Sequence, residues 1–112
     1  MTKTANISKE NEIAFIALSN PPMNALSQGV RAGLKKAVED ALNDSAIKAI
    51  VIHGDGNVFS AGADISEFHL PAEEPHLPDV CDLIEQSEKP VIAAIHGFAL
   101  GGAFEILSLI HI

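Results

Sequence analysis

Hydrophobic residues along the chain follow two spacings, which predict strands and helices in turn. A mostly apolar run from Glu12 to Ser19 predicts a strand that ends at the turn Asn20-Pro21-Pro22. Apolar residues then recur at helical spacing from Val30 to Leu42, with charged residues between them, which predicts an amphipathic helix of about four turns. Ser27 is suited to cap the start of this helix, which we expect to end near Asn43.

Two further strands are predicted by short continuous apolar runs, Ala49–His53 and Val91–Ile95. Runs of this kind are typical of strands that are buried on both faces of a sheet. Between them lie a glycine-punctuated loop from Gly54 to Gly62, an exposed connection marked by prolines over residues 71–78, and a predicted helix from Asp79 to Gln86. Strands that alternate with helices indicate an α/β fold with parallel strand pairs.

Two segments combine small residues with a transition from strand to helix. They are Phe59–Asp64 and Gly97–Glu105, and a last helix is expected to begin near Gly102. Glycine and alanine let a ligand approach the main chain, and a helix N-terminus carries unpaired N–H groups with a partial positive charge. Two such termini that face each other would form an oxyanion hole. The residues alone leave tight turns for helix–strand packing as an open alternative.

Composition excludes several classes of protein. The chain has 112 residues, is 47% hydrophobic and has a formal net charge of −8. An acidic chain without Trp or Tyr argues against binding nucleic acid through a basic surface or a stacking platform. The single cysteine, Cys81, cannot form an internal disulfide or by itself a zinc site. With no apolar run near the ~20 residues of a membrane span and no signal-peptide core, we expect a soluble, intracellular protein.

Familiar catalytic and cofactor motifs fail on particular residues. The dinucleotide pattern G-x-G-x-x-G is broken because Phe59 takes the place of the third glycine. The hydrolase pattern G-x-S-x-G around Ser60 lacks its first glycine. The histidines show no metal-ligand spacing, so no metal site is predicted. His53 is interpreted as a packed strand residue, and His96 is expected to contact the neighbouring loop without a catalytic role.

Four segments of the chain, in their order and spacing, resemble the crotonase, or enoyl-CoA hydratase/isomerase, superfamily. The resemblance runs from about Ile13 to Glu105. The segments that carry it are Asn20–Leu26, Lys48–Ile52, Phe59–Ile65, and Lys89–Gly97 followed by Ala99–Gly102.

This resemblance implies a crotonase-like α/β fold, the ClpP/crotonase spiral of ββα units, of which the chain holds the N-terminal portion. The motifs are most similar to the hydratase/isomerase part of peroxisomal bifunctional enzymes, which implies a peroxisomal location, with a cytoplasmic one as the alternative. Residues 1–106 are then the N-terminal part of the domain. Residues 107–112 match the translation of a common sequencing adapter and are expected to be non-native.

The resemblance also implies the chemistry. Family substrates are acyl thioesters of coenzyme A, and hydration of a 2-enoyl thioester passes through an enolate held by main-chain donors. Those donors correspond to the N–H groups of Ala63 and Gly102, and Glu105 corresponds to a general acid/base. The substrate contacts correspond to Ala61, Ala63, Asp64, Ile65 and Gly102. Taken alone, Asp64 is equally suited to cap a short helix, and Glu105 to a helix N-terminus.

Cofactors and partners follow from the same resemblance. Hydration needs no cofactor, and NAD is implied only if a dehydrogenase part is fused. Acyl-CoA is the expected partner, and nucleic acid and membranes are not. The full-length protein is expected to be a trimer-type homo-oligomer or a fused multidomain monomer. Because the chain is acidic, the cations for the coenzyme A phosphates are expected from further sequence or a neighbouring subunit.

Other readings of the sequence remain. A monofunctional enoyl-CoA delta isomerase needs a single acid/base carboxylate, whereas a hydratase uses a second glutamate beyond residue 112. A non-catalytic nucleotide-binding α/β module is the alternative from another class. We expect the 112 residues expressed alone to be inactive and poorly folded, because strands buried on both faces need more helices than they supply.

Overall fold

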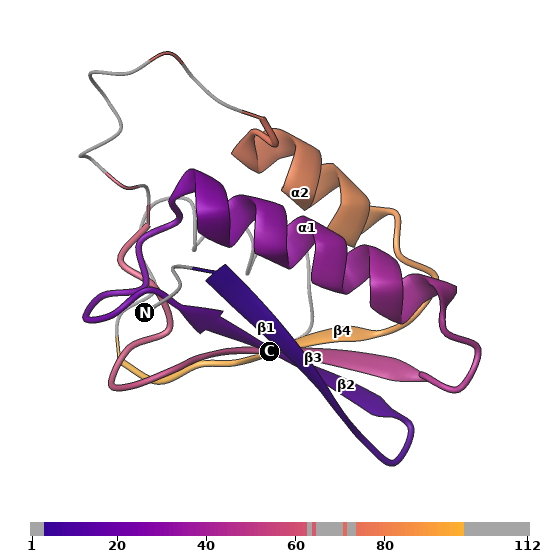
Figure 1. Ribbon diagram of the computed structural model, residues 1–112. Helices are drawn as coiled ribbons and strands as arrows, with labels where there is room; N and C mark the ends of the chain where they lie inside the picture. Colours follow the sequence, from indigo (N-terminus) through magenta and orange to yellow (C-terminus); the bar gives the residue numbers. More distant parts are fainter. Residues whose placement is uncertain (1–3, 63, 65–70, 72–73, 98–112) are drawn as a thin grey trace.

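A single twisted sheet organises the described part of the chain, which is residues 4–62, 64, 71 and 74–97 of a computed structural model. Its strands are β1 (Thr4–Glu10), β2 (Ile13–Ser19), β3 (Ala49–Gly54) and β4 (Val91–Ala94), in that order across the sheet (Figure 1). β1 pairs antiparallel with β2, whereas β2, β3 and β4 run parallel to one another. The three predicted strands are confirmed as β2, β3 and β4, and so is their parallel pairing.

Strand β1 was not predicted, and the hairpin that it forms with β2 corrects the expected element order. Its apolar content is low, but its burial alternates: Ala5 is buried and Ile7 half-buried, while Asn6 and Ser8, next to Ile7 on either side, are exposed. Such alternation is enough for an edge strand with one face on the core. The tight turn to β2 is made by Asn11, whose φ of 56° lies in the left-handed region that Asn tolerates better than most residues.

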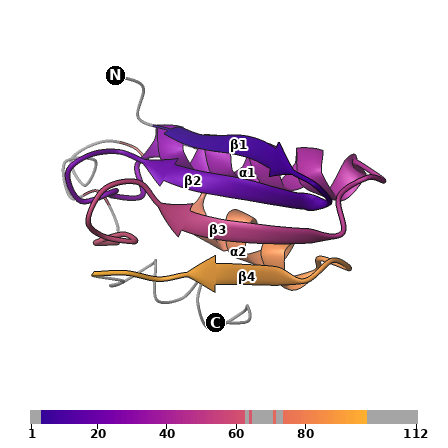
Figure 2. The same ribbon diagram turned by 90° about the horizontal axis from the view of Figure 1, so that it is seen from below.

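Both described helices, α1 (Gln28–Asn43) and α2 (Leu77–Glu85), cover the same face of the sheet. Figure 2 shows them behind the four strands. The buried face of α1 follows the predicted helical spacing, and the Ser27 hydroxyl accepts a 3.3 Å hydrogen bond from the N–H of Val30, so the predicted cap is confirmed. These side chains pack on inward residues of the central strands, such as Ile16 and Ile52.

Helix α2 begins two residues earlier than predicted. Pro78, which we assigned to the exposed connection, lies in its first turn. Proline is tolerated there because the first N–H groups of a helix have no intrahelical acceptor. The main-chain N–H of His76, just before the helix, instead donates a 3.0 Å hydrogen bond to the Asp79 carboxylate.

The predicted burial of both sheet faces is wrong for the described residues. Along β4, Val91 and Ala93 are buried, whereas Ile92 and Ala94 are exposed. β3 shows the same alternation between buried and half-buried residues. Both described helices lie on one face of the sheet (Figure 2), so no described helix covers the other set of side chains in these apolar runs.

Candidate functional site

Three loops meet at one edge of the sheet. Residues 20–26 lie between β2 and the Ser27 cap of α1, residues 55–62 follow β3, and residues 95–97 follow β4. Because the three strands are parallel, their carboxyl ends lie at the same edge, where Figure 1 shows the loops together. Ligands of parallel α/β sheets bind outside the carboxyl ends of the strands. This edge is therefore the candidate site.

The side chain of Asn24 fastens the loop after β3 to the turn after β2. Asn24 is fully buried and has a φ of 52°. Its amide nitrogen lies 2.8 Å from the carbonyl oxygen of Asp55, 3.0 Å from that of Val58 and 3.3 Å from that of Phe59. Its amide oxygen accepts a 2.9 Å hydrogen bond from the N–H of Asn20. One asparagine thus joins its own turn to most of the neighbouring loop.

Ser60 makes the reverse connection. Its hydroxyl is fully buried, donates a 2.6 Å hydrogen bond to the carbonyl oxygen of Asn24, and accepts a 3.1 Å bond from the N–H of Gly62. Two main-chain bonds flank this contact: the N–H of Ala61 donates to the carbonyl oxygen of Met23 (2.9 Å), and that of Leu26 donates to Gly62 (2.7 Å). The end of the loop therefore runs beside the turn and is held by side-chain and main-chain groups together.

The other side of the loop is held by the residues that leave β4. The N–H of Phe59 donates a 2.8 Å hydrogen bond to the carbonyl oxygen of His96. The His96 ring nitrogen Nε2 lies 2.7 Å from the carbonyl oxygen of Gly56, which confirms the predicted contact between His96 and the loop. Phe59, at the start of the first small-residue segment, thus lies beside His96, the residue before the second segment, of which the structure describes only Gly97.

Two glycines are required by close main-chain approach. A Cβ on Gly54 would lie 2.3 Å from the carbonyl oxygen of Val58. A Cβ on Gly97, whose φ is 66°, would lie 2.4 Å from the carbonyl oxygen of Asn57. Because no side-chain atom fits at these distances, the loop can pack in this way only with glycine at both positions.

Of the predicted site residues, the structure describes Ala61 and Asp64, both half-buried and both at this edge. The remaining predicted residues lie outside the described residues; these are Ala63, Ile65, Gly102 and Glu105. Sequence reasoning assigned no role to Asn24 or Ser60. The signal that was available for Asn24 is an asparagine inside a Pro-Pro-containing turn, where a left-handed residue is common.

A connection beside the site is tied to the start of α1. The Arg31 guanidinium donates 2.8 Å hydrogen bonds to the carbonyl oxygens of Leu26 and Pro75, and the Gln28 side chain donates to that of Glu74 at 2.9 Å. Arg31 thus joins this connection to the residues before α1 through main-chain carbonyl groups.

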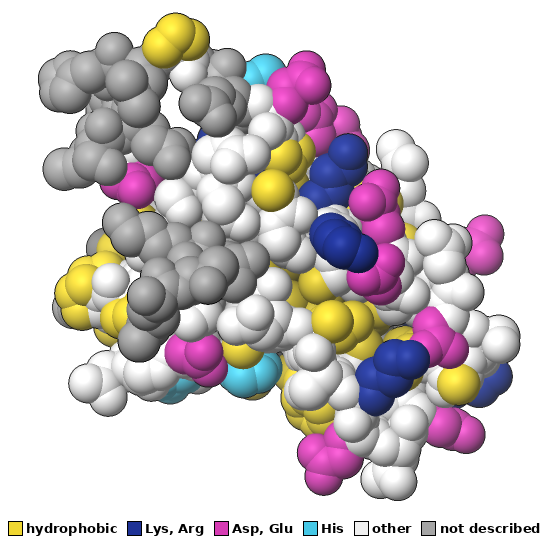
Figure 3. All heavy atoms as spheres, viewed as in Figure 1, with side chains coloured by type: hydrophobic (Ala, Val, Ile, Leu, Met, Phe, Trp, Pro, Cys, Tyr) yellow, Lys and Arg dark blue, Asp and Glu magenta, His cyan; other side chains and the backbone are white. Residues whose placement is uncertain are grey.

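Elsewhere on the helical side, basic side chains lie among acidic ones (Figure 3), so this face has a mixed charge.

Within the described ranges, no group of three His, Cys, Asp or Glu side chains is placed to hold a metal ion. Nor is any described helix long and apolar enough to cross a membrane. The loops at the candidate site are held together by main-chain N–H and carbonyl groups with the side chains of Asn24, Ser60 and His96. Together, the fold and these contacts define an α/β protein whose candidate site, at the carboxyl edge of the sheet, is shaped by main-chain groups.

The family follows from comparison with known proteins. The sequence model of the enoyl-CoA hydratase/isomerase family matches residues 8–111, and the chain belongs to this family. It is 48% identical over 102 residues to the peroxisomal bifunctional enzyme of Danio rerio, covering 91% of this chain and 14% of that protein. It is 40% identical over 109 residues to a probable enoyl-CoA hydratase of Bacillus subtilis, covering 89% of this chain and 42% of that protein.

Solved structures show the same fold. The enoyl-CoA hydratase/carnithine racemase from Magnetospirillum magneticum matches with a TM-score of 0.83 and 33% identity over 95% of this chain and 43% of that one. Pseudomonas aeruginosa DspI matches with a TM-score of 0.86 and 27% identity, over 97% of this chain and 44% of that one. The predicted crotonase-like α/β fold is confirmed. The chain spans less than half the length of these relatives.

Proposed function

We propose that the full-length protein hydrates 2-enoyl-CoA thioesters in fatty-acid β-oxidation. The observation that carries the proposal is the loop from Gly54 to Gly62, which is fastened on both sides by main-chain bonds and leads directly into Ala63. Hydration adds a hydroxyl group to C3 and a proton to C2 and develops negative charge on the thioester oxygen. A rigid loop that presents a main-chain N–H is suited to stabilise such charge, because its dipole needs no reorganisation.

The proposal assigns roles to the residues of the two glycine-marked segments. The N–H groups of Ala63 and Gly102 donate to the thioester oxygen. Glu105, three residues after Gly102, exchanges the proton as general acid/base. Ala61, Ala63, Asp64, Ile65 and Gly102 contact the acyl-CoA.

The reaction as proposed needs no cofactor, since water and the thioester supply every atom of the product. NAD enters only if a fused dehydrogenase part is present. The names of the Danio rerio and Arabidopsis thaliana relatives support a peroxisomal location in preference to a cytoplasmic one. The assembly is proposed as a homo-oligomer of the trimer type or a fused multidomain monomer.

A steady-state assay of the full-length protein, which follows the loss of crotonyl-CoA absorbance, tests this function. Glu105→Gln should bind the thioester but lower kcat by roughly 10²–10⁴-fold, the usual contribution of general acid–base catalysis. Glu85→Gln, on the exposed surface of α2, is the matched control and should keep wild-type turnover. Wild-type kcat in Glu105→Gln would remove Glu105 from the mechanism.

The oxyanion donors have their own test. Gly102→Pro deletes one N–H and should raise the barrier by ~3–4 kcal/mol, whereas Ala63→Ser keeps its N–H and should be mild. A full-length protein that turns over no 2-enoyl-CoA of any chain length but shifts the double bond of a 3-enoyl-CoA would replace hydration by the isomerase alternative.

A further inference from the structure

We propose that Asn24 and Ser60 are positioning residues of the hydratase site, which together set the orientation of the main chain that enters Ala63. This inference rests on the proposed function, because it takes the N–H after Gly62 as an oxyanion donor. It assigns a function to two buried polar side chains that neither bind substrate nor exchange protons.

The first observation is the set of hydrogen bonds that the Asn24 side chain forms. Both ends of its carboxamide are used: the oxygen accepts from its own turn, at Asn20, and the nitrogen faces the carbonyl oxygens of Asp55, Val58 and Phe59. The contacts of the amide nitrogen span 31 to 35 residues of sequence. A turn of apolar residues would fill the same space without orienting three carbonyl groups, so the asparagine does more than fill the core.

The second observation is that the Ser60 hydroxyl links Asn24 to Gly62. The carbonyl oxygen of Asn24 accepts from the Ser60 hydroxyl, and the same hydroxyl accepts from the N–H of Gly62. Gly62 has a φ of 97°, a conformation that other residues rarely adopt. Glycine can adopt many backbone conformations, and the hydroxyl therefore helps to select this one at Gly62. The bonded N–H belongs to the peptide between Ala61 and Gly62, and the next peptide, between Gly62 and Ala63, carries the N–H of Ala63.

A third observation concerns the neighbouring main-chain groups. The N–H of Ala61 and the carbonyl oxygen of Gly62 are bonded to Met23 and Leu26. The loop end is thus fixed on the same turn from which Asn24 projects, so a change at Ser60 acts on a framework that otherwise stays in place. Misplacement of a reacting group by about 1 Å can cost ~10²-fold in rate, so a small rotation at Gly62 is enough to be measured.

The test compares two buried serines in the full-length protein. Ser60→Ala removes both hydrogen bonds of the hydroxyl, to Asn24 and from Gly62. Ser27→Ala is the matched control, because Ser27 is also buried and its hydroxyl also accepts from a main-chain N–H, that of Val30 in the first turn of α1. We expect Ser60→Ala to lower kcat on crotonyl-CoA about 10- to 100-fold with KM within about twofold, and Ser27→Ala to keep both constants within about twofold even where it lowers stability more.

A spectroscopic readout separates position from stability. Infrared difference spectra of bound butyryl-CoA, which cannot be hydrated, report how strongly the donors polarise its thioester carbonyl. We expect the downshift of the carbonyl frequency to be smaller in Ser60→Ala than in the wild type, and unchanged in Ser27→Ala. If Ser60→Ala does not fold, Ser60→Cys keeps the volume with a weaker donor and acceptor, and should show an intermediate downshift and kcat.

A folded Ser60→Ala or Ser60→Cys protein with wild-type kcat and the full carbonyl downshift overturns the inference, and so does an equal loss of downshift in Ser27→Ala. A failure of the proposed function can be distinguished from a failure of this inference. If the wild type hydrates no enoyl-CoA while the downshift still depends on Ser60, the positioning role stands and only the reaction is wrong.

Discussion

The N–H of Phe59 donates a 2.8 Å hydrogen bond to the carbonyl oxygen of His96, and this bond joins the loop after β3 to the residues that leave β4. It places Phe59, where the first small-residue segment begins, beside the residue that precedes Gly97, where the second begins. Changes that separate these segments should therefore affect the site as well as stability.

Gly97 permits this approach, and Gly97→Ala should destabilise the protein by about 2–4 kcal/mol. The estimate adds ~1 kcal/mol for a left-handed alanine to ~1–3 kcal/mol for overpacking against Asn57. Gly56→Ala is the matched control: its φ of 80° is also left-handed, but nothing lies within 4 Å of its Cβ position, so it should cost only ~1 kcal/mol. Urea unfolding measures both, and equal losses would show that the contact with Asn57 is unimportant.

Gly54→Ala should be at least as damaging, for a steric reason alone. The atoms that its Cβ would meet belong to the main chain of Val58 and Phe59, at 2.3 to 2.8 Å, and cannot move without opening the loop. We expect a loss of about 3 kcal/mol or more, together with reduced hydratase kcat. Urea unfolding and the crotonyl-CoA assay check this, and wild-type stability in Gly54→Ala would contradict the described loop.

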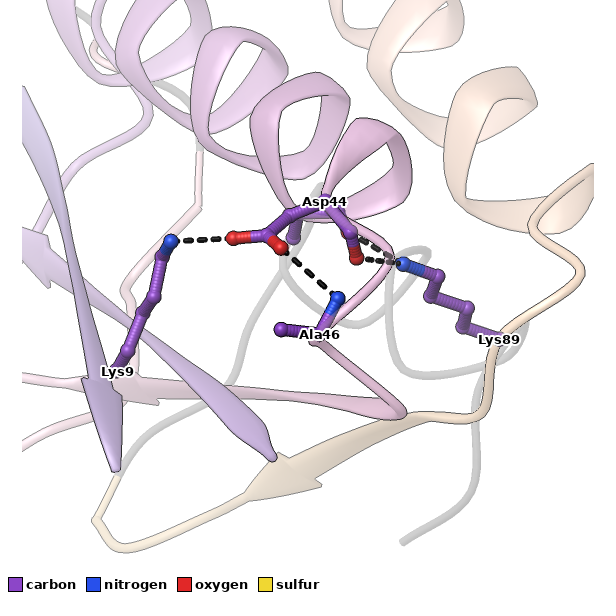
Figure 4. Close-up of polar contacts among 5 residues, drawn as sticks. Lys9, Asp44, Ala46 and Lys89 are labelled. Atoms are coloured by element: carbon purple, nitrogen blue, oxygen red, sulfur yellow. Dashed lines mark hydrogen bonds and ion pairs between the residues drawn. The ribbon is translucent and has the colours of Figure 1, made fainter. Parts of the chain in front are cut away.

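Lys89 ties the end of α1 to the segment before β4. Its ammonium group donates hydrogen bonds of 2.7 and 2.8 Å to the carbonyl oxygens of Ala41 and Asp44, as Figure 4 shows for Asp44. These acceptors lie at the negative end of the helix, so Lys89→Met should lower the free energy of unfolding by about 1–2 kcal/mol.

The control for this change is Lys36→Met. Lys36 forms an exposed pair with Asp40 on the same helix, so its loss should cost less than about 0.5 kcal/mol. Chemical unfolding of both variants makes the comparison, and a larger loss for Lys36→Met than for Lys89→Met would rule out the capping role.

Asp44 should make stability depend on acid pH. The hydrogen bond from the Lys9 ammonium, followed by that from the N–H of Ala46, holds the pKa of Asp44 below its ordinary value of 3.8 (Figure 4). Because this pKa is lower in the folded than in the unfolded protein, the unfolded state takes up the proton first as the pH falls. The contribution of Asp44 to the free energy of unfolding is complete above its pKa in the unfolded protein. It is lost as the pH falls through its pKa in the folded protein.

Urea midpoints measured from about pH 5 to about pH 2 should therefore fall more steeply for the wild type than for Asp44→Asn. The asparagine can still accept from Ala46 but carries no charge for Lys9. Parallel slopes for the two proteins would show that the pair with Lys9 contributes nothing.

Local sequence patterns were enough to predict much of the fold. The period of apolar residues in α1 and its cap at Ser27 depend on neighbours within one or two helical turns, so both could be predicted. The start of α2 could not be placed, since a proline in the first helical turn and one in a loop look alike in sequence. β1 escaped notice because only its pairing with β2 reveals that Ala5 and Ile7 face the core.

By itself, the sequence determined the α/β class, the parallel strands and the two small-residue segments, because these depend on spacing and residue size. Only the tertiary structure decided what holds the first segment in place. The contacts of Asn24 with Asp55 and with Ser60 cross 31 and 36 residues of chain. Hydrogen bonds at that separation leave no periodic trace, because the fold alone brings their partners together.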